Sequence, residues 1–263
     1  MMDWILPYLL IGGFAGVLAG LLGVGGGLLI VPFLAWAFVQ QGLGSDWVMH
    51  LAIGTSLATI VVTSLSSVLA HHSKAVVRWD LFWLLLPGIV VGALGGAQLA
   101  SLVDTPFLQY LFASFELLVA IQMGLSIQPT AHQPMPGRRG SSIAGGVIGA
   151  VSALVGIGGG TMTVPWLLWN RIAIHQAVGT SAAVGLPIAI AGAVGFIWAG
   201  WGVEGLPSSS SGFIYWPAFI GIALMSVVTA PLGARWAHQL PAKKLKRLFA
   251  LFLCNRSDPS SLG

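Results

Sequence analysis

The sequence predicts an all-α, polytopic membrane protein. We expect it to be an inverted repeat of two halves, each with a broken Gly-rich helix pair and three spanning helices. Of its 263 residues, 56% are hydrophobic and only 7% are charged, with a mean hydropathy of +0.91. Soluble domains carry about 25% charged residues, so this composition excludes both a soluble globule and a disordered chain. The apolar runs are long and do not alternate with polar residues, which favours helices over a barrel.

A duplication within the chain predicts the two halves. Three stretches return in the same order, which chance similarity of Gly-rich membrane sequence does not explain. The pairs are Gly13–Trp36 with Gly146–Trp169 at an offset of 133, His50–Ser56 (HLAIGTS) with His175–Ser181 (HQAVGTS), and, more weakly, GAQLASLV from Gly96 with GARWAHQL from Gly233. We therefore expect a first membrane repeat at 1–130, a cytoplasmic linker at 131–141 and a second membrane repeat at 142–263.

Each half divides into five apolar segments. They are expected at 4–22, 28–39, 50–70, 81–103 and 106–127, and again at 142–155, 161–169, 175–198, 213–240 and 242–254. A span needs about 20 residues, so the second segment of each half is too short to cross comfortably. We expect the first two segments to enter, break at the glycines and return to the same side. The start, MMDWILPYLL, has no positive n-region or cleavage site and is interpreted as a first membrane segment rather than a signal peptide.

The charges support this folding of the chain. If the first two segments return to their starting side, ten of the eleven cations share one face, which the positive-inside rule makes cytoplasmic: Lys74, Arg78, Arg138, Arg139, Arg171, Arg235, Lys243, Lys244, Lys246 and Arg247. The opposite face receives Arg256 and the acids Asp3, Asp46, Asp104, Glu204 and Asp258. Equivalent loops then carry opposite charge, which indicates inverted halves. The cluster at 243–247 is interpreted as an anchor at lipid headgroups, with a partner site as the alternative.

Two glycine clusters are the candidate substrate site. They are Gly25, Gly26 and Gly27, followed by Pro32, and Gly158, Gly159 and Gly160, followed by Pro165. Glycine costs a helix about 1 kcal/mol relative to alanine, and proline removes a donor, so each helix should break. Unwound backbone in a membrane lines a cavity or is buried in protein, and the exposed helix amino termini favour an anion. The alternative is that the glycines only allow close helix packing.

Hydroxyl groups near the third segments extend this candidate site. The paired GTS elements supply Thr55 and Ser56 in one half and Thr180 and Ser181 in the other. In the first half Thr59, Thr63, Ser66 and Ser67 continue the polar stripe, which either lines a path or bonds back to the helix's own carbonyls. Thr161 and Thr163 follow the second glycine cluster where the first half has Leu28 and Ile30, a difference that would make the site asymmetric.

Three ionisable residues are candidates for coupling transport to an ion gradient. His50 and His175 precede the GTS elements and are of the type that titrates near neutral pH, although a helix-capping role is the alternative. Glu116 lies in an apolar run, where an ionisable group is costly, and is either functional, protonated or bonded to a neighbouring helix. The single cysteine, Cys254, excludes an intramolecular disulfide and a cysteine-built metal site.

The stretches GVGGGLLIVPFL and GIGGGTMTVPWLL, with the paired GTS, resemble the TauE/SafE family of sulfite-exporter-like permeases. The resemblance covers almost the whole chain. It implies an inner-membrane carrier whose substrates lie among sulfite, sulfoacetate, other sulfonates, thiosulfate and organic anions. The matching positions are Gly25, Gly26, Gly27 and Pro32 with Gly158, Gly159, Gly160 and Pro165, and more loosely the two GTS stretches.

The sequence therefore predicts a multi-pass secondary carrier for a small anion, working by alternating access. It has no nucleotide motif, and we expect no cofactor, no metal and no nucleic-acid partner, with membrane lipid around it and oligomers possible. A passive anion channel and an accessory membrane subunit are the competing interpretations. An enzyme is disfavoured because no metal-spaced His cluster and no nucleophile with a base is present. The last segment, at 242–254, is too short to cross about 30 Å of hydrocarbon, which suggests a truncated or frame-altered final helix.

Overall fold

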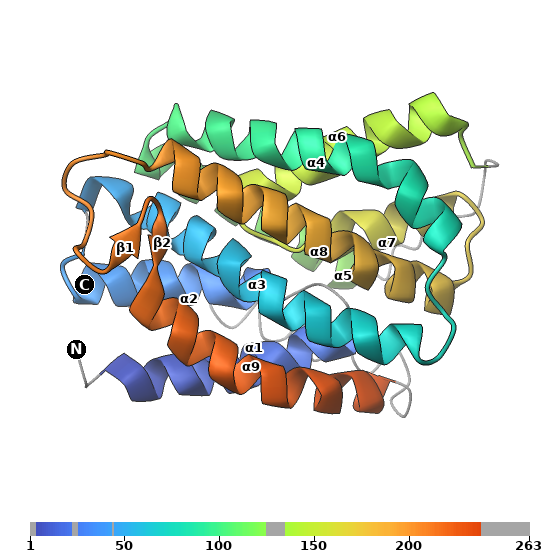
Figure 1. The fold of residues 1–263 in the computed structure, drawn as a ribbon, viewed down its shortest axis with the longest axis horizontal. Helices are drawn as coiled ribbons and strands as arrows, with labels where there is room; N and C mark the ends of the chain where they lie inside the picture. Colours follow the sequence, from blue (N-terminus) through green and yellow to red (C-terminus); the bar gives the residue numbers. More distant parts are fainter. Residues whose placement is uncertain (1–3, 23–25, 44, 125–134, 238–263) are drawn as a thin grey trace.

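The computed structural model describes residues 4–22, 26–43, 45–124 and 135–237, and these residues form a bundle of helices (Figure 1). The first half comprises α1 (Ile5–Leu22), α2 (Gly27–Gln40), a short 3₁₀ turn η2 (Ser45–Trp47), α3 (Val48–His72), α4 (Trp79–Ser101) and α5 (Thr105–Gly124). The second half comprises α6 (Arg138–Val155), α7 (Gly160–Trp169), α8 (Ile174–Ala199), strands β1 (Ser210–Ser211) and β2 (Ile214–Tyr215), and α9 (Trp216–Ala237). The all-α prediction is confirmed.

Four of the described helices are long and apolar enough to cross a membrane: α3, α4, α8 and the stretch Trp216–Gly233 of α9. They match the third and fourth predicted segments of each half. Shorter apolar helices include Ile5–Gly20 and Gly27–Gln40. The expected final segment at 242–254 lies outside the described residues.

Two local features differ from the sequence prediction. Helix α6 begins at Arg138, so the last four residues of the expected linker are helical. The serine-rich loop before α9 forms a small antiparallel hairpin, in which Ser210 pairs with Tyr215 and Ser211 with Ile214. Gly212 has φ +54°, a left-handed conformation that glycine adopts readily and that this tight turn uses. A two-residue strand carries too short a pattern for sequence periodicity to detect.

The helices of the two halves run in opposite directions (Figure 1). Helix α1 starts at the end where the hairpin lies and α2 returns to that end, whereas α6 and α7 start from and return to the opposite end. Helices α3 and α8 are antiparallel at the centre, since Gly192 packs on Leu57 while Gly185 packs near Ser64. This arrangement is that of an inverted repeat.

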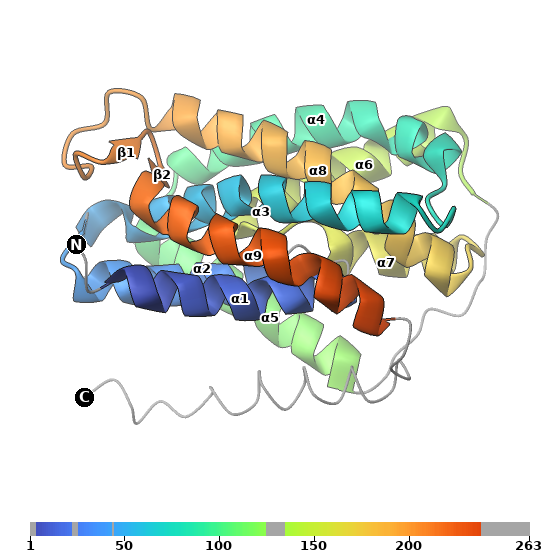
Figure 2. The same cartoon turned by 60° about the horizontal axis from the view of Figure 1, so that its bottom comes forward.

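Each half packs its outer helices against the other half. Helix α1 lies along α9, and its repeat equivalent α6 lies along α4, as the view in Figure 2 also shows. The glycine contacts repeat as well: Gly12 approaches the backbone of Ile222, and Gly145 approaches the backbone of Leu85 in the same way. Further glycines at these two seams are Gly16, Gly88, Gly92, Gly96, Gly149 and Gly233. For these residues, close helix packing is the role that the structure shows.

Charged residues separate to the two ends of the bundle. The ends of α3, α7 and α9 and the starts of α4 and α6 gather Lys74, Arg78, Arg138, Arg139, Arg171 and Arg235 at one end (Figure 1). The opposite end holds Asp46, Asp104 and Glu204. Apart from Asp80, which pairs with Arg78 at the cationic end, and Glu116 on α5, the described charged residues follow the segregation that the charge pattern predicted.

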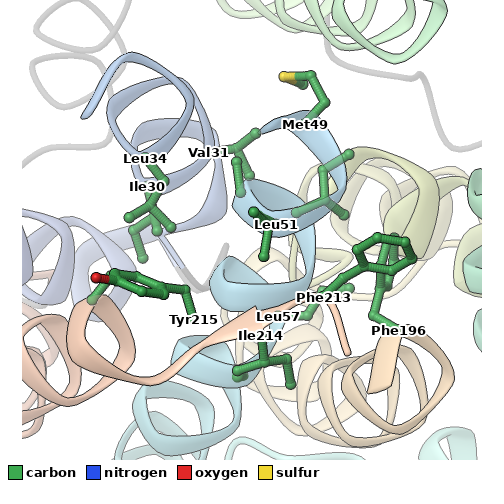
Figure 3. Packing of buried hydrophobic residues seen from close by; sticks show 14 of the residues in the cluster. Ile30, Val31, Leu34, Met49, Leu51, Leu57, Phe196, Phe213, Ile214 and Tyr215 are labelled. Atoms are coloured by element: carbon green, nitrogen blue, oxygen red, sulfur yellow. The ribbon is translucent and has the colours of Figure 1, made fainter. Parts of the chain in front are cut away.

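The largest apolar core surrounds α2, the first half of α3 and the hairpin. Figure 3 shows Ile30, Val31 and Leu34 of α2 beside α3, with Tyr215 and Phe213 of the hairpin segment close by. These side chains are at most 4% exposed. The core therefore surrounds the first turns of α2, immediately after the first glycine cluster.

Candidate functional site

Glycine makes the break in each helix pair possible. Gly26 (φ 77°, ψ −4°) caps α2 and Gly159 (φ 74°, ψ −8°) caps α7, so the two equivalent residues share one left-handed conformation. Helix α6 ends at Gly156, which also has a positive φ of 77°. A residue with a Cβ adopts this conformation at a cost, and the conformation stops the helix. The predicted break is therefore present between α6 and α7, and α2 starts anew at Gly27. Gly25 lies outside the described residues.

The two glycine clusters meet in the middle of the protein. Gly27, the first residue of α2, packs on the carbonyl of Gly156, and a methyl group on Gly27 would lie 2.9 Å from Ile157 Cα. The Ser56 hydroxyl of α3 donates a 2.9 Å hydrogen bond to that same Gly156 carbonyl. The start of α2, the end of α6 and the GTS element of α3 thus form one crossing point. Glycine at position 27 is needed because backbone contacts backbone there.

The second break is bordered by α3, α6 and α8. A methyl group on Gly185 of α8 would lie 2.7 Å from the Gly158 carbonyl and 3.4 Å from Ser64 Oγ of α3. A methyl group on Gly159 would lie 3.3 Å from Ser152 Oγ of α6. Residues 158 and 159 therefore lie beside α6 and α8, and Ser64 of α3 lies close to the same Gly185. Sequence reasoning missed Ser64 and Ser152, although a comparison of the halves contains the signal, because their equivalents are Ala189 and Ala19.

Two hydroxyl groups in the first turn of α7 have no hydrogen-bond partner among the described residues. The amides of Met162 and Thr163 both donate to the Gly159 carbonyl, at 3.1 and 2.9 Å, and no side chain caps the helix. The hydroxyl oxygens of Thr161 and Thr163 are buried without a hydrogen-bond partner in this part of the chain. Thr163 is fully buried and lies on the same face of α7 as Gly160, the first residue of that helix.

The threonines of both GTS elements fasten the chain that leads into the following helix of the other half. Thr55 Oγ1 accepts a 2.9 Å hydrogen bond from the backbone N–H of Tyr215, directly before α9. Thr180 Oγ1 accepts a 3.0 Å bond from the N–H of Arg78, directly before α4. The neighbouring glycines repeat the match, with Gly54 against the carbonyl of Phe213 and Gly179 against Val76. The structure therefore shows a fastening role for both threonines, and their predicted contact with substrate stays a prediction.

The polar stripe of α3 mostly bonds to its own helix. Thr59 Oγ1 donates to the Ser56 carbonyl at 2.7 Å, and Thr63 Oγ1 lies 3.3 Å from the carbonyl of Thr59. This is the back-bonding alternative that the sequence left open. Ser67 Oγ is buried and has no hydrogen-bond partner among the described residues. Ser181 is also fully buried, on α8.

The three coupling candidates lie in different environments. His50 is fully buried, and its Nε2 donates to the carbonyls of Ala100 at 2.9 Å and Val103 at 3.2 Å, at the end of α4. His175, its sequence equivalent, is exposed. Glu116 is half-buried on α5. The structure gives His50 a helix-fastening role, and a coupling role for any of the three stays a prediction.

Comparison with known proteins decides the family. Residues 8–255 match the family model described as "Sulfite exporter TauE/SafE". The chain belongs to the TauE/SafE family. A "Probable membrane transporter protein" of Haemophilus influenzae is 39% identical over 96% of both chains. A similarly named protein of Methanocaldococcus jannaschii is 28% identical over 95% of this chain and 92% of its own. The "Probable membrane transporter protein YdhB" of Bacillus subtilis is 25% identical over 90% of this chain and 91% of its own.

The family and the names of these relatives identify the TauE/SafE protein as a membrane transporter and not an enzyme. No solved structure matches the chain. Among the described residues no group of three or more His, Cys, Asp or Glu side chains is placed to hold a metal ion.

Proposed function

We propose that this TauE/SafE protein is a secondary transporter that moves a small anion across the inner membrane by alternating access. The observation that carries the proposal is the meeting of two broken helix pairs, which enter from opposite ends and touch at Gly27 and Gly156. Transporters with inverted repeats place their substrate sites at discontinuous helices near the middle of the bilayer.

The chemistry at the crossing point favours an anion. The amino termini of α2 and α7 both point toward it, and each carries the positive end of a helix dipole. The buried polar side chains among the described residues are all Ser, Thr or His. Hydroxyl and amide groups donate well to oxygen atoms that carry negative charge, so an oxyanion fits this set of donors. Sulfite and organosulfonates are such anions, and the family description names a sulfite exporter.

The inverted packing supports alternating access. Helices α3 and α8 cross at the centre, and each carries a GTS element that holds the chain entering α9 or α4. These two contacts lie toward opposite ends of the bundle (Figure 1). Because the contacts are equivalent under the repeat, opening one while keeping the other would give the two alternative states that a carrier requires.

Uptake of labelled sulfite, methanesulfonate and simple organic acids into proteoliposomes tests the proposal. We expect wild-type protein to accumulate at least one anion, and Gly26→Leu and Gly159→Leu to abolish uptake, because both glycines need a positive φ. Gly95→Leu is the matched control, since no described atom beyond the adjacent residues and backbone of its own helix lies within 4 Å of a methyl group there. Wild-type rates in both cap variants would show that the glycines do not shape the site.

Two further readouts separate the competing interpretations. Electrical recording from the same reconstituted protein would show large unitary currents for a passive channel and none for a carrier. Purified wild-type protein that moves no tested anion would refute the proposal and support an accessory role. Folding of each purified variant is checked by its size-exclusion profile, so that loss of uptake is not confused with loss of folding.

A further inference from the structure

The two glycine breaks are equivalent in backbone but not in chemistry. Their caps share one conformation, yet among the described residues the second break has hydroxyl side chains at positions where the first half has aliphatic ones. The equivalent pairs, with the second-break residue first, are Thr161 and Leu28, Thr163 and Ile30, and Ser152 and Ala19. Helix α3 adds Ser64 near the second break, where α8 has Ala189 at the equivalent position. An exact duplication would have produced matching pairs, so the halves have diverged at the residues around the breaks.

Two hydroxyl groups at the second break are buried without a hydrogen-bond partner among the described residues, which costs free energy. Thr163 is fully buried, and its Oγ1 has no hydrogen-bond partner among the described residues. Thr161 Oγ1 is buried and unpartnered in the same way. A hydroxyl removed from water without a partner costs about 1–3 kcal/mol, and native structures keep such groups for a reason. A threonine in a helix ordinarily avoids this cost by bonding to the carbonyl four residues earlier. Neither threonine does so, and both remain available to a ligand.

At the first break, aliphatic side chains pack around the start of α2. Leu28 and Leu29 are 2% exposed, and Ile30 and Val31 are fully buried. These side chains belong to the largest apolar core, in which Ile30, Val31 and Leu34 pack beside α3 (Figure 3). A methyl group on Gly27 would also lie 3.1 Å from Ile60 Cδ1, where the second break has Gly185. The amino terminus of α2 is therefore packed by aliphatic groups that offer no donor to an oxyanion.

The geometry points to a single, one-sided oxyanion seat at the start of α7, formed by the Thr161 and Thr163 hydroxyls at the positive end of the helix dipole. Ser64 and Ser152 border this seat, and the α2 break serves as its packed apolar wall. The inference rests on the proposed function and deepens it. It places the anionic head group on one repeat and assigns the other repeat a structural role.

The test compares equivalent positions in the two halves. Methanesulfonate is the probe, because it carries a single negative charge throughout the neutral pH range and has three equivalent oxygens. Thr163→Val and Thr161→Val remove only the hydroxyls. Ile30→Val, at the position equivalent to Thr163, is the matched control. Two quantities are measured: the KM for uptake into proteoliposomes, and the Kd of methanesulfonate for the purified protein by titration calorimetry.

A hydrogen bond to a charged ligand contributes about 1.5–3 kcal/mol, which corresponds to about a tenfold to hundredfold change in affinity. We expect Thr163→Val to raise both KM and Kd by at least tenfold, Thr161→Val to raise them in the same direction, and Ile30→Val to leave them unchanged. Unchanged affinity in both threonine variants, with normal wild-type uptake, would overturn the one-sided seat and leave the transporter proposal intact. An equal loss in Ile30→Val would overturn it too, because packing around the breaks rather than the threonine hydroxyls would then determine the affinity. Wild-type protein that neither binds nor moves any tested anion would refute both proposals.

Discussion

Replacing Thr55 by valine tests the contact that ties the two halves together. Thr55 is fully buried, and its hydroxyl accepts the N–H of Tyr215 across 160 residues of sequence. In the hairpin, the N–H of Trp216 donates to the carbonyl of Ser209. Hydrogen-bonded and non-hydrogen-bonded pairs alternate along an antiparallel ladder, so the preceding residue, Tyr215, directs its N–H away from the partner strand. Valine keeps the shape of threonine and leaves this buried N–H without an acceptor.

The structure sets the size of the expected effect. An unsatisfied buried donor costs about 1–3 kcal/mol, so the free energy of unfolding of Thr55→Val should fall by about that amount. The equivalent variant, Thr180→Val, frees the N–H of Arg78, which is only partly buried and which water can reach. Its loss should stay below about 1 kcal/mol, since a hydrogen bond to water replaces the lost one.

The assay is reversible unfolding of the purified protein in mixed micelles of mild and denaturing detergent, followed by far-ultraviolet circular dichroism. Both variants and the wild type are measured in the same detergent, because absolute stabilities depend on it. A Thr180→Val loss that equals or exceeds the Thr55→Val loss would refute the argument that burial of the donor determines the cost.

Three further results are expected. Gly92→Ala should lower the free energy of unfolding by about 1–3 kcal/mol, since a methyl group there would lie 2.8 Å from the carbonyl carbon of Gly146. Gly95→Ala has open space around the added methyl group and should be neutral or slightly stabilising. Equal changes in the two variants would contradict this argument. His50→Leu should lower the free energy of unfolding by about 1–3 kcal/mol, because it removes the side chain that donates to the carbonyl of Ala100 at the end of α4. Unchanged stability together with a transport rate that no longer depends on pH would instead indicate a coupling role. On a Cys254→Ser background, cysteines placed at Lys74 and in the β1–β2 hairpin should react with impermeant thiol reagents from opposite sides, and labelling from one side would exclude the inverted topology.

The sequence predicted the helix boundaries well for a physical reason. Apolar length and glycine or proline breaks act locally, so composition and spacing alone locate them. Helices α2 and α7 begin at Gly27 and Gly160, at the glycine clusters that the sequence singled out. The hairpin before α9 escaped detection, because its two strands owe their pairing to Gly212 and to Thr55 rather than to a repeating pattern.

The candidate site was predicted less completely. The sequence singled out the glycines and GTS elements as candidates, yet it did not distinguish hydroxyls that accept backbone amides from hydroxyls that have no partner among the described residues. Thr55 and Thr180 accept backbone amides, whereas Thr161 and Thr163 have no partner among the described residues. Ser64 and Ser152 became relevant only through their positions beside Gly185 and Gly159.

By itself, the sequence determined that this is a helical membrane protein, that it contains two related halves, and that each half breaks at glycine. These properties follow from hydrocarbon content and backbone conformational preference, which each short stretch carries on its own. The tertiary structure alone decided which of these hydroxyl groups bond to backbone amides and which have no partner among the described residues. A hydrogen-bond partner is fixed by the approach of segments far apart in the chain, and no local pattern encodes that approach.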